Sequence, residues 1–278
     1  MNIGIRLHDT RPGNLKERLL FAREQGFSCA HIAMSKAIDG FSMQDAPALL
    51  NSELAAGMRK DLTDTGISCA VLGCYLNLAD PDAERRAATH EIYKAHLRFA
   101  AMTGAGVVGT ETYANPESVF ADPAPVSEEA YRLFIDSLRP VVRYAEETGT
   151  YLAVEPVWYH IISTPERAER MLNDVRSDHL RIILDTVNLI RPELIGKEDE
   201  VVDDAIRRFG DRISILHMKD YTVRDGKAAS LACGRGQMRY EKLLAFAKAN
   251  SLPMTLEDTV PENAEDARLY LERIGQKL

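Results

Sequence analysis

The chain repeats one pattern eight times: a short apolar run rich in β-branched residues, followed by a longer segment in which apolar residues have helical spacing. The apolar runs predict strands near residues 2–7, 28–34, 68–74, 106–111, 151–157, 181–187, 212–219 and 254–258. The longer segments predict helices over 14–25, 46–65, 82–103, 127–148, 165–175, 198–209, 240–249 and 263–275. Strict alternation allows a doubly wound sheet or a closed barrel. Eight units in 278 residues favour an α/β fold with a single-domain (β/α)₈ TIM barrel over residues 1–278.

The charge and hydropathy of the chain argue against two kinds of partner. The formal net charge is −8 at pH 7 and no cluster of Lys and Arg is visible, so we expect no nucleic acid partner. No apolar stretch approaches the roughly 20 residues that cross a bilayer, so we expect no membrane partner. The four cysteines are scattered, which is typical of small buried side chains in a reducing compartment. We therefore expect a soluble, cytoplasmic protein.

Four of the predicted strands end on a side chain that can bind a metal ion. Glu155, Asp185, His217 and Glu257 close the apolar runs of the last four strands. Because the C-terminal ends of parallel barrel strands meet at one face, we expect these side chains to converge. Three carboxylates with one imidazole form a mainly oxygen-donor set. This set favours one divalent ion, Mn²⁺ first, with Co²⁺, Mg²⁺ or Zn²⁺ as alternatives.

Each of these residues also has an ordinary structural explanation when it is taken alone. Glu155 could pair with an arginine, Asp185 could cap the following turn, and His217 could be a core histidine. A carboxylate buried at the mouth of a barrel, however, must be neutralised by a cation or by protonation. The presence of four such residues at four successive strand ends therefore favours the metal site.

Further polar side chains follow the strand ends and are candidates for substrate binding. They are His8, Glu111, Trp158, His160 and Lys219. Trp158 could stack on a sugar ring, His160 could bind a hydroxyl group, and Lys219 could hold a phosphate or carboxylate. The alternatives are a core or lid aromatic, a solvated loop histidine, and a lysine that pairs with Asp220 or Glu257.

Two stretches on the same face are longer than a barrel needs. They comprise residues 113–126 after the fourth strand and residues 222–239 after the seventh strand. Because barrels of this type keep their active sites on the C-terminal face, both stretches are predicted to cover a substrate.

The order of these motifs resembles the xylose isomerase-like barrel family of sugar and sugar-phosphate isomerases and epimerases, with the ketose 3-epimerase branch nearest. In that family a Glu, an Asp, a His and a Glu at the ends of strands five to eight hold one divalent metal. The matching positions are Glu155 in Val-Glu-Pro-Val, Asp185 in Leu-Asp-Thr-Val-Asn, His217 in Leu-His-Met-Lys-Asp and Glu257 in Thr-Leu-Glu-Asp. The Gly-Arg-Gly turn at Arg235 resembles the family's Gly-x-Gly loop, which adds Arg235 to the substrate-binding candidates.

The resemblance implies a metal-dependent isomerase or epimerase that acts on a small polyhydroxylated carbonyl compound. It implies that Glu155 and Glu257 are the catalytic acid/base pair, which removes and returns a proton next to a carbonyl. The metal would stabilise the enediolate formed in between. Homo-oligomers are usual in this family, so the resemblance also allows a homo-oligomer.

Two positions depart from the epimerase pattern and leave the substrate open. Asn188 stands where family epimerases commonly carry a substrate-holding His, and Val223 stands where an Arg is expected. The amide of Asn188 can still hydrogen-bond a hydroxyl or carbonyl group, so Asn188 stays a substrate-binding candidate.

Three other functions are alternatives to the isomerase. A lyase or dehydratase of the same metal-barrel family would begin with the same proton abstraction. A metal-binding barrel without turnover could serve as the subunit of a larger complex. An abasic-site endonuclease would need several more metal-binding histidines than the sequence supplies, and the negative net charge opposes DNA binding.

Overall fold

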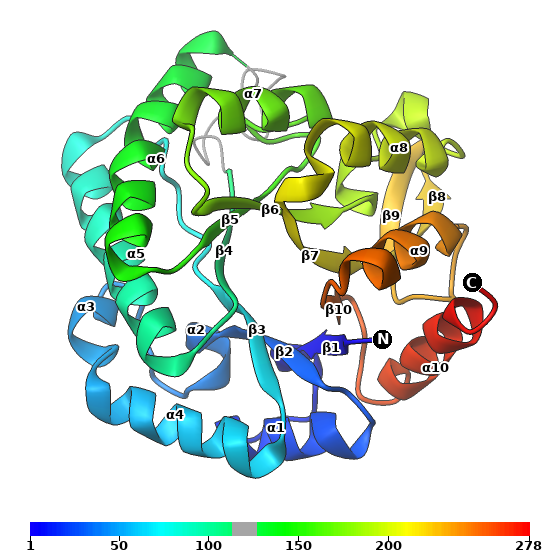
Figure 1. Cartoon of the computed structure of the whole chain (residues 1–278), viewed down its shortest axis with the longest axis horizontal. Coiled ribbons are helices and arrows are strands. Elements are labelled where there is room, and N and C mark those ends of the chain that lie inside the picture. The colour runs from blue at the N-terminus through cyan, green and yellow to red at the C-terminus, as the bar shows by residue number, and fades with distance from the viewer. Residues whose placement is uncertain (113–126) are drawn as a thin grey trace.

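Eight parallel strands close into a barrel in the computed structural model, which describes residues 1–112 and 127–278 (Figure 1). Their order around the barrel is β1-β10-β7-β6-β5-β4-β3-β2, with β1 closing the ring against β2. The strands are β1 (Ile3–Arg6), β2 (Cys29–Ala33), β3 (Ser68–Gly73), β4 (Val107–Glu111), β5 (Leu152–Glu155), β6 (Leu180–Asp185), β7 (Ile213–Met218) and β10 (Met254–Leu256). The predicted TIM barrel is confirmed.

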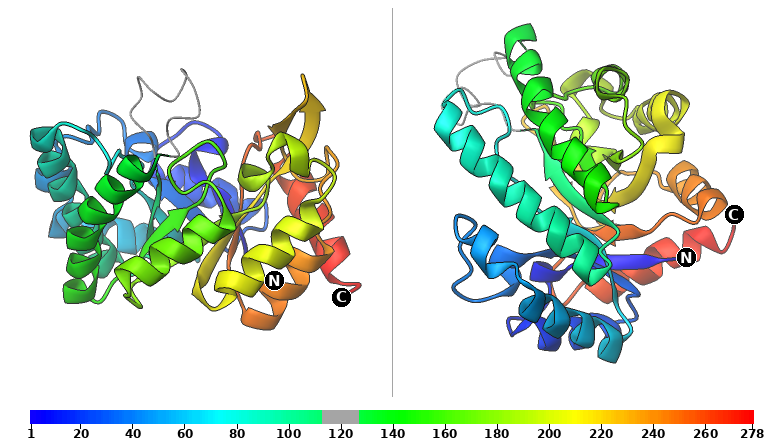
Figure 2. Two further views of the ribbon diagram at one scale, coloured as in Figure 1. Left: turned by 90° about the horizontal axis from the view of Figure 1, so that it is seen from above. Right: turned by 60° about the vertical axis from the view of Figure 1, so that its left-hand side comes forward.

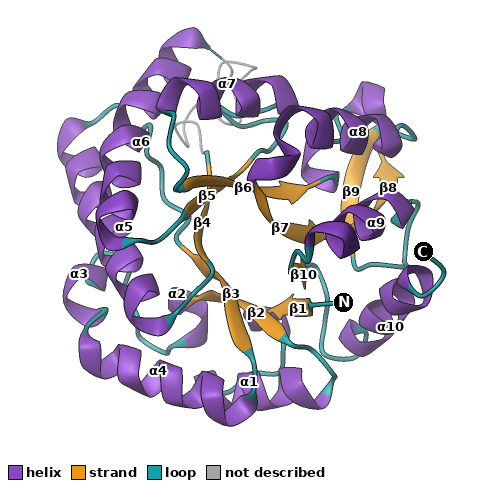
Figure 3. Cartoon of the chain, in the orientation of Figure 1, coloured by secondary structure: helices purple, strands orange, loops and turns teal. Residues whose placement is uncertain are grey.

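Helices surround this ring of strands (Figure 3). They are α1 (Leu15–Glu24), α2 (Met34–Ala37), α3 (Ala46–Leu49), α4 (Ser52–Thr65), α5 (Ala83–Thr103), α6 (Glu128–Thr148), α7 (Pro165–Val175), α8 (Glu198–Phe209), α9 (Glu241–Asn250) and α10 (Ala264–Gly275). The one helix predicted over 46–65 is in fact two, because Asn51 is extended and its side chain caps α4 by accepting from Leu54 N. Within the described residues, no helix is both long and apolar enough to span a membrane.

The helix ends follow local signals in the sequence. Ser127 and Thr164 cap α6 and α7 by accepting hydrogen bonds from backbone N–H groups in the first turn. Gly66, Gly104 and Gly149 follow α4, α5 and α6 with left-handed backbone angles, which a glycine adopts without steric cost. These caps fix the length of each helix and therefore the point at which the next strand starts.

The interior of the barrel is filled by a small apolar cluster, which forms a floor beneath the site. Its members are Cys29, Ala70, Val71, Val107, Ala153, Ile183 and Ile215. Strand side chains alternate with a period of two, so the residue two places after a floor residue points to the same side. Three such pairs are Ala153/Glu155, Ile183/Asp185 and Ile215/His217. Polar side chains thus stand directly above the apolar floor.

An antiparallel hairpin lies between β7 and α9. It consists of β8 (Asp220–Arg224) and β9 (Lys227–Leu231). Figure 2 shows it projecting from one end of the barrel, at the upper right of the left-hand view. Asp225 and Gly226 have φ angles of 49° and 73°, as a two-residue hairpin turn requires. The stretch predicted as a loop over 222–239 therefore contains ordered strands, whereas the stretch predicted over 113–126 lies outside the described residues.

Candidate metal centre

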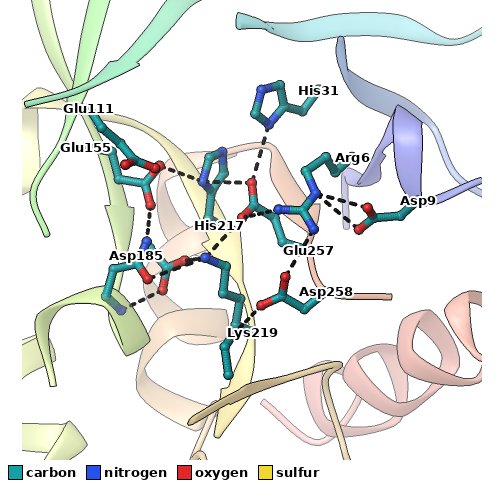
Figure 4. A network of polar contacts seen from close by, with 12 residues as sticks. Arg6, Asp9, His31, Glu111, Glu155, Asp185, His217, Lys219, Glu257 and Asp258 are labelled. Atoms are coloured by element: carbon teal, nitrogen blue, oxygen red, sulfur yellow. Dashed lines mark hydrogen bonds and ion pairs between the residues drawn. The ribbon is translucent and has the colours of Figure 1, made fainter. Parts of the chain in front are cut away.

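The four predicted metal ligands converge at the C-terminal end of the barrel. Glu155 ends β5, Asp185 ends β6, His217 lies in β7 and Glu257 directly follows β10. All four side chains are buried. Figure 4 shows them pointing toward one another, together with the side chain of Lys219. Four strand ends therefore supply one compact polar cluster.

His217 lies at the centre of this cluster. Its Nδ1 is 3.0 Å from Oε2 of Glu155 and 3.2 Å from Oε1 of Glu257. The two glutamates come from β5 and from the loop after β10, which are not neighbours in the barrel. The imidazole thus bridges two carboxylates that would otherwise repel each other.

Lys219 and Asn188 complete the cluster. The ammonium group of Lys219 is 3.0 Å from Oδ2 of Asp185, 3.1 Å from Oε2 of Glu257 and 3.4 Å from Oδ1 of Asn188. The amide of Asn188 donates to Oε1 of Glu155 at 2.6 Å, and its backbone N–H donates to Oδ1 of Asp185 at 3.1 Å. Lys219 was predicted to pair with Asp220 or Glu257. In the structure it contacts Glu257 and also Asp185.

Two polar residues of this region were not predicted from the sequence. Nη1 of Arg6 is 3.3 Å from Oε2 of Glu257, and Nη2 is 3.0 Å from Oδ1 of Asp258. Nδ1 of His31 is 3.4 Å from Oε1 of Glu257, and its Nε2 is 3.2 Å from the hydroxyl of Tyr75. Both are polar side chains in short apolar strands, which is the signal that could have identified them.

The charges of the cluster shift the proton affinities of its members in opposite directions. Burial raises the pKa of Glu155 and Glu257, but His217 outweighs it, and both pKa values lie below the usual range. For Asp185 burial prevails over the nearby Lys219 and raises the pKa to about 6. Burial lowers the pKa of His217, but the carboxylates of Glu257 and Glu155 raise it to about 9. The imidazole of His217 therefore binds a proton tightly in the metal-free protein. The ring must lose that proton before it can bind a metal.

The donor set of the cluster fits a divalent cation. Ligand atoms of Glu155, Asp185 and His217 lie within 4.8 Å of one another, and so do those of His31, His217 and Glu257. The two groups share His217, so the four predicted ligands are divided between them, and His31 joins the second. Both ring nitrogens of His217 are buried without a hydrogen-bond partner among residues 1–112 and 127–278, and Nδ1 is the one that faces the two glutamates. Buried carboxylates beside an imidazole with an unpaired nitrogen are suitable ligands for Mn²⁺, Co²⁺ or Zn²⁺.

A cavity of about 320 Å³ opens beside the cluster. The residues that line it include His8, His31, Lys36, Tyr75, Glu111 and Glu257. Two predicted substrate-binding residues, His8 and Glu111, thus face the same space as Glu257. Burial, with Arg6 nearby, lowers the pKa of His8 to about 4, and burial together with Glu155 raises the pKa of Glu111 to about 8. At neutral pH both side chains are therefore uncharged and can donate or accept hydrogen bonds.

Trp158 and His160 lie in the loop after β5, close to the cluster. The backbone N–H of Trp158 donates to the carbonyl oxygen of Asn188 at 2.8 Å. His160 is buried, and its Nδ1 lies 3.6 Å from Oε2 of Glu111. This loop is therefore tied to both Asn188 and Glu111.

Arg235 lies apart from the cluster. The carboxylate of Asp220 accepts hydrogen bonds from the backbone N–H groups of Gly234 and Met238, at 2.9 and 2.8 Å, and so holds the turn that carries Arg235. The Arg235 side chain is exposed, and its guanidinium lies 3.9 Å from the carboxylate of Asp266 in α10. Among the residues predicted to bind substrate, Arg235 is thus placed on the outer surface.

Comparison with known proteins gives a family match over most of the chain. The family described as the xylose isomerase-like TIM barrel matches residues 19–274. A curated relative, D-psicose 3-epimerase from Enterocloster bolteae, is 26% identical over 167 residues. This match covers 59% of the present chain and 50% of the length of that relative.

Solved structures of similar proteins cover nearly the whole chain. The 3-keto-D-glucoside 4-epimerase from E. coli has a TM-score of 0.76 and 20% identity, covering 98% of this chain and 99% of its own. The probable 3-DHS dehydratase from Bacillus anthracis has a TM-score of 0.72 and 15% identity, covering 99% of this chain and 98% of its own. At these identities the structural matches establish the fold alone.

Proposed function

Because this chain belongs to the xylose isomerase-like TIM barrel family, we propose that it is a divalent-metal-dependent isomerase or epimerase. Its substrate is a small polyhydroxylated carbonyl compound, such as a sugar or sugar phosphate. The observation that carries this proposal is the convergence of three buried carboxylates and one imidazole, donated by four strand ends, beside a cavity. Burying so many carboxylates together is costly unless positive charge lies beside them. Lys219 and Arg6 supply part of that charge, and a divalent ion would add to it.

In this proposal the metal is held by Glu155, Asp185, His217 and Glu257, and Mn²⁺ is the favoured ion. When bound, the ion supplies Lewis acidity that stabilises the negative charge of an enediolate. The residues of the chain determine where this happens. His217 keeps the two glutamates within 3.0 and 3.2 Å of one nitrogen, which fixes the position of both carboxylates.

The proton is moved by Glu155 and Glu257. Their carboxylates come from different strands and both lie beside His217, so in this proposal a substrate bound there contacts both. A proton acceptor must be ionised, and the positive charge of a metal bound beside both carboxylates would keep them so. One carboxylate removes the proton next to the carbonyl, and either the same group or the opposite one returns it.

The remaining site residues orient the substrate. Asn188 donates to Glu155 and also contacts Lys219, so it positions a catalytic carboxylate besides offering its amide to a hydroxyl group. His8 and Glu111 line the cavity and are placed to bind hydroxyl groups. Trp158 and His160 belong to the loop after β5, which contacts Asn188 and Glu111. The cavity, about 320 Å³, has room for a small sugar.

Hydrogen exchange in heavy water tests the proposed function. The metal-loaded protein is incubated in heavy water with a panel of ketoses, sugar phosphates and related acids. A true substrate gains deuterium at the carbon next to its carbonyl. Glu257→Gln is expected to lower that rate by roughly 10²- to 10⁴-fold, because the amide cannot accept the proton.

Glu147→Gln, at an exposed position of α6, is the matched control and should exchange at the wild-type rate. Exchange that persists in Glu257→Gln would remove Glu257 from the reaction. Failure of the whole panel to exchange would favour a metal-binding barrel without turnover.

A lyase or dehydratase is the second candidate, because it begins with the same proton abstraction and breaks a different bond afterwards. Asn188 supports this second candidate, because it replaces the histidine that commonly holds the substrate in the family's epimerases. Product analysis distinguishes the two reactions. An epimerase product has the mass of its substrate, whereas a dehydratase product has lost one water.

A further inference from the structure

Lys219 is a buried lysine inside the ligand cluster. It directly follows β7, two residues after His217, and its side chain reaches Asp185 and Glu257. The residue is only 9% exposed. Its backbone is held in place, because the hydroxyl of Tyr240 donates to the Lys219 carbonyl oxygen at 3.0 Å. The chain therefore places a positive charge in the cluster, on a side chain whose backbone is anchored.

The ammonium group of Lys219 contacts two of the four residues that we assign to the metal. It lies 3.0 Å from Asp185 and 3.1 Å from Glu257, and its third neighbour is the amide oxygen of Asn188 at 3.4 Å. The contact with Asn188 is a hydrogen bond, whereas those with Asp185 and Glu257 are ion pairs. Figure 4 shows the ammonium group between Asp185 and Glu257.

A metal ion and this ammonium group need the same oxygens. Two positive charges that share carboxylates repel each other strongly in a buried site, where water screens them poorly. The flexible four-carbon stem of lysine, however, lets the ammonium group move away while the backbone stays in place.

We propose that Lys219 is an internal counter-cation that competes with the metal for Asp185 and Glu257 and thereby sets the metal affinity of the site. The inference rests on the metal site of the proposed function and adds a step to it. Binding of the metal displaces the ammonium group from these two carboxylates, without any covalent change. In the metal-free protein, Lys219 holds the two carboxylates in place.

A supporting role for Lys219 predicts the opposite behaviour. If the ammonium group oriented the carboxylates for the metal, removing it would weaken metal binding, as the loss of other supporting partners does. The sign of the change in affinity therefore decides between competition and support.

The test compares Lys219→Met with Lys242→Met in the full-length, chelator-treated protein. Methionine has a similar length and no charge, and Lys242 is an exposed lysine paired with Asp203, which makes it the matched control. The dissociation constant for Mn²⁺ is measured by titration calorimetry. Melting temperatures are recorded in the presence of chelator. Lys219→Gln is the second variant, because its amide can still donate to one carboxylate if the methionine variant does not fold.

We expect Lys219→Met to bind Mn²⁺ at least about tenfold more tightly than wild type, and Lys219→Gln to change in the same direction. In chelator Lys219→Met should melt at a lower temperature than wild type, because two buried carboxylates lose their counter-cation. Lys242→Met should match wild type in both measurements. Mn²⁺ binding by wild type with equal or weaker binding by the Lys219 variants overturns the competition alone. Absence of Mn²⁺ binding in every protein overturns the metal site and the competition together.

Discussion

The barrel mouth and the helix layer around it both bury histidines, and His217 at the mouth behaves in the opposite way to His96 in the helix layer. His217 is 2% exposed and His96, in α5, is 0% exposed. Burial lowers the pKa of His96 to about 4. Its hydrogen bond to the carbonyl oxygen of Ile92 raises the pKa only slightly against this effect. At the mouth, carboxylates overcome the same effect of burial and raise the pKa of His217 to about 9.

This difference separates a region built for stability from a region built to bind charge. In the helix layer, the imidazole of His96 is uncharged at neutral pH. At the mouth, acidic and basic groups are buried in direct contact, although they would be more stable in water. We expect that the charged groups buried at the mouth serve ligand binding, whereas His96 serves stability alone.

The largest expected effect comes from replacing the two histidines in turn. His217→Gln should lower the rate of substrate deuteration by more than about 1,000-fold, because the several kcal/mol that a bound metal contributes depend on this residue. His96→Gln should leave that rate unchanged and lower the melting temperature. The rates and melting curves of both variants are measured in parallel. A loss of rate in His96→Gln, with the fold intact by circular dichroism, would contradict the separation of the two regions.

Metal removal should reveal the next largest effect. At a free Mn²⁺ concentration 1,000 times the dissociation constant, binding should add about 4 kcal/mol to the free energy of unfolding. The measurement is the difference in chemical denaturation with Mn²⁺ and with chelator. Asp185→Asn should lose most of this difference, whereas Asp203→Asn, at an exposed position of α8, should retain it. An equal gain in both variants would place the ion elsewhere.

The smallest effect is the pH dependence of stability, which should have opposite signs for the two histidines. His96 has a folded pKa of about 4 against an ordinary value of 6.5, so it contributes stability above pH 6.5 that is lost as the pH falls toward 4. Between pH 7 and 5 this loss should be about 2 kcal/mol, and His96→Gln should remove it.

His217 should show the reverse dependence in chelator-treated protein. Its pKa is raised from 6.5 to about 9, so its contribution is present below pH 6.5 and is lost as the pH rises through 9. Denaturation curves of wild type and His217→Gln at pH 6.5 and 9 measure the difference. Equal pH dependence of wild type and variant would mean that the carboxylates do not hold this proton.

Much of the fold and the centre of the site could be predicted from the sequence, because both depend on local patterns. The period of two along each strand, with a polar residue near its C-terminal end, places Glu155, Asp185 and His217 above the apolar floor. His31 obeys the same alternation, because it lies two places after Cys29 of the floor. It was overlooked because it stands in the middle of its strand and not at the end of an apolar run.

The contacts of the long side chains were also beyond prediction. Arg6 reaches Glu257 and Asp258 from the other end of the chain, and no spacing along the sequence indicates a contact over 251 residues. The hairpin after β7, by contrast, was predictable in principle. Asp225 and Gly226 form the Asp-Gly pair typical of a two-residue hairpin turn, but the long segment around them was interpreted as a loop.

The hairpin is anchored at its base and free at its tip. The carboxylate of Asp220 accepts hydrogen bonds from the backbone at the start of the hairpin and after it, at Tyr221, Gly234 and Met238. Asp225 and Gly226, at the turn, are exposed. Extra residues inserted between Asp225 and Gly226 would lengthen the arm without shifting His217 or Lys219. The tip is therefore a position where the protein can be diversified, by natural insertion or by a grafted peptide, while its chemistry is conserved.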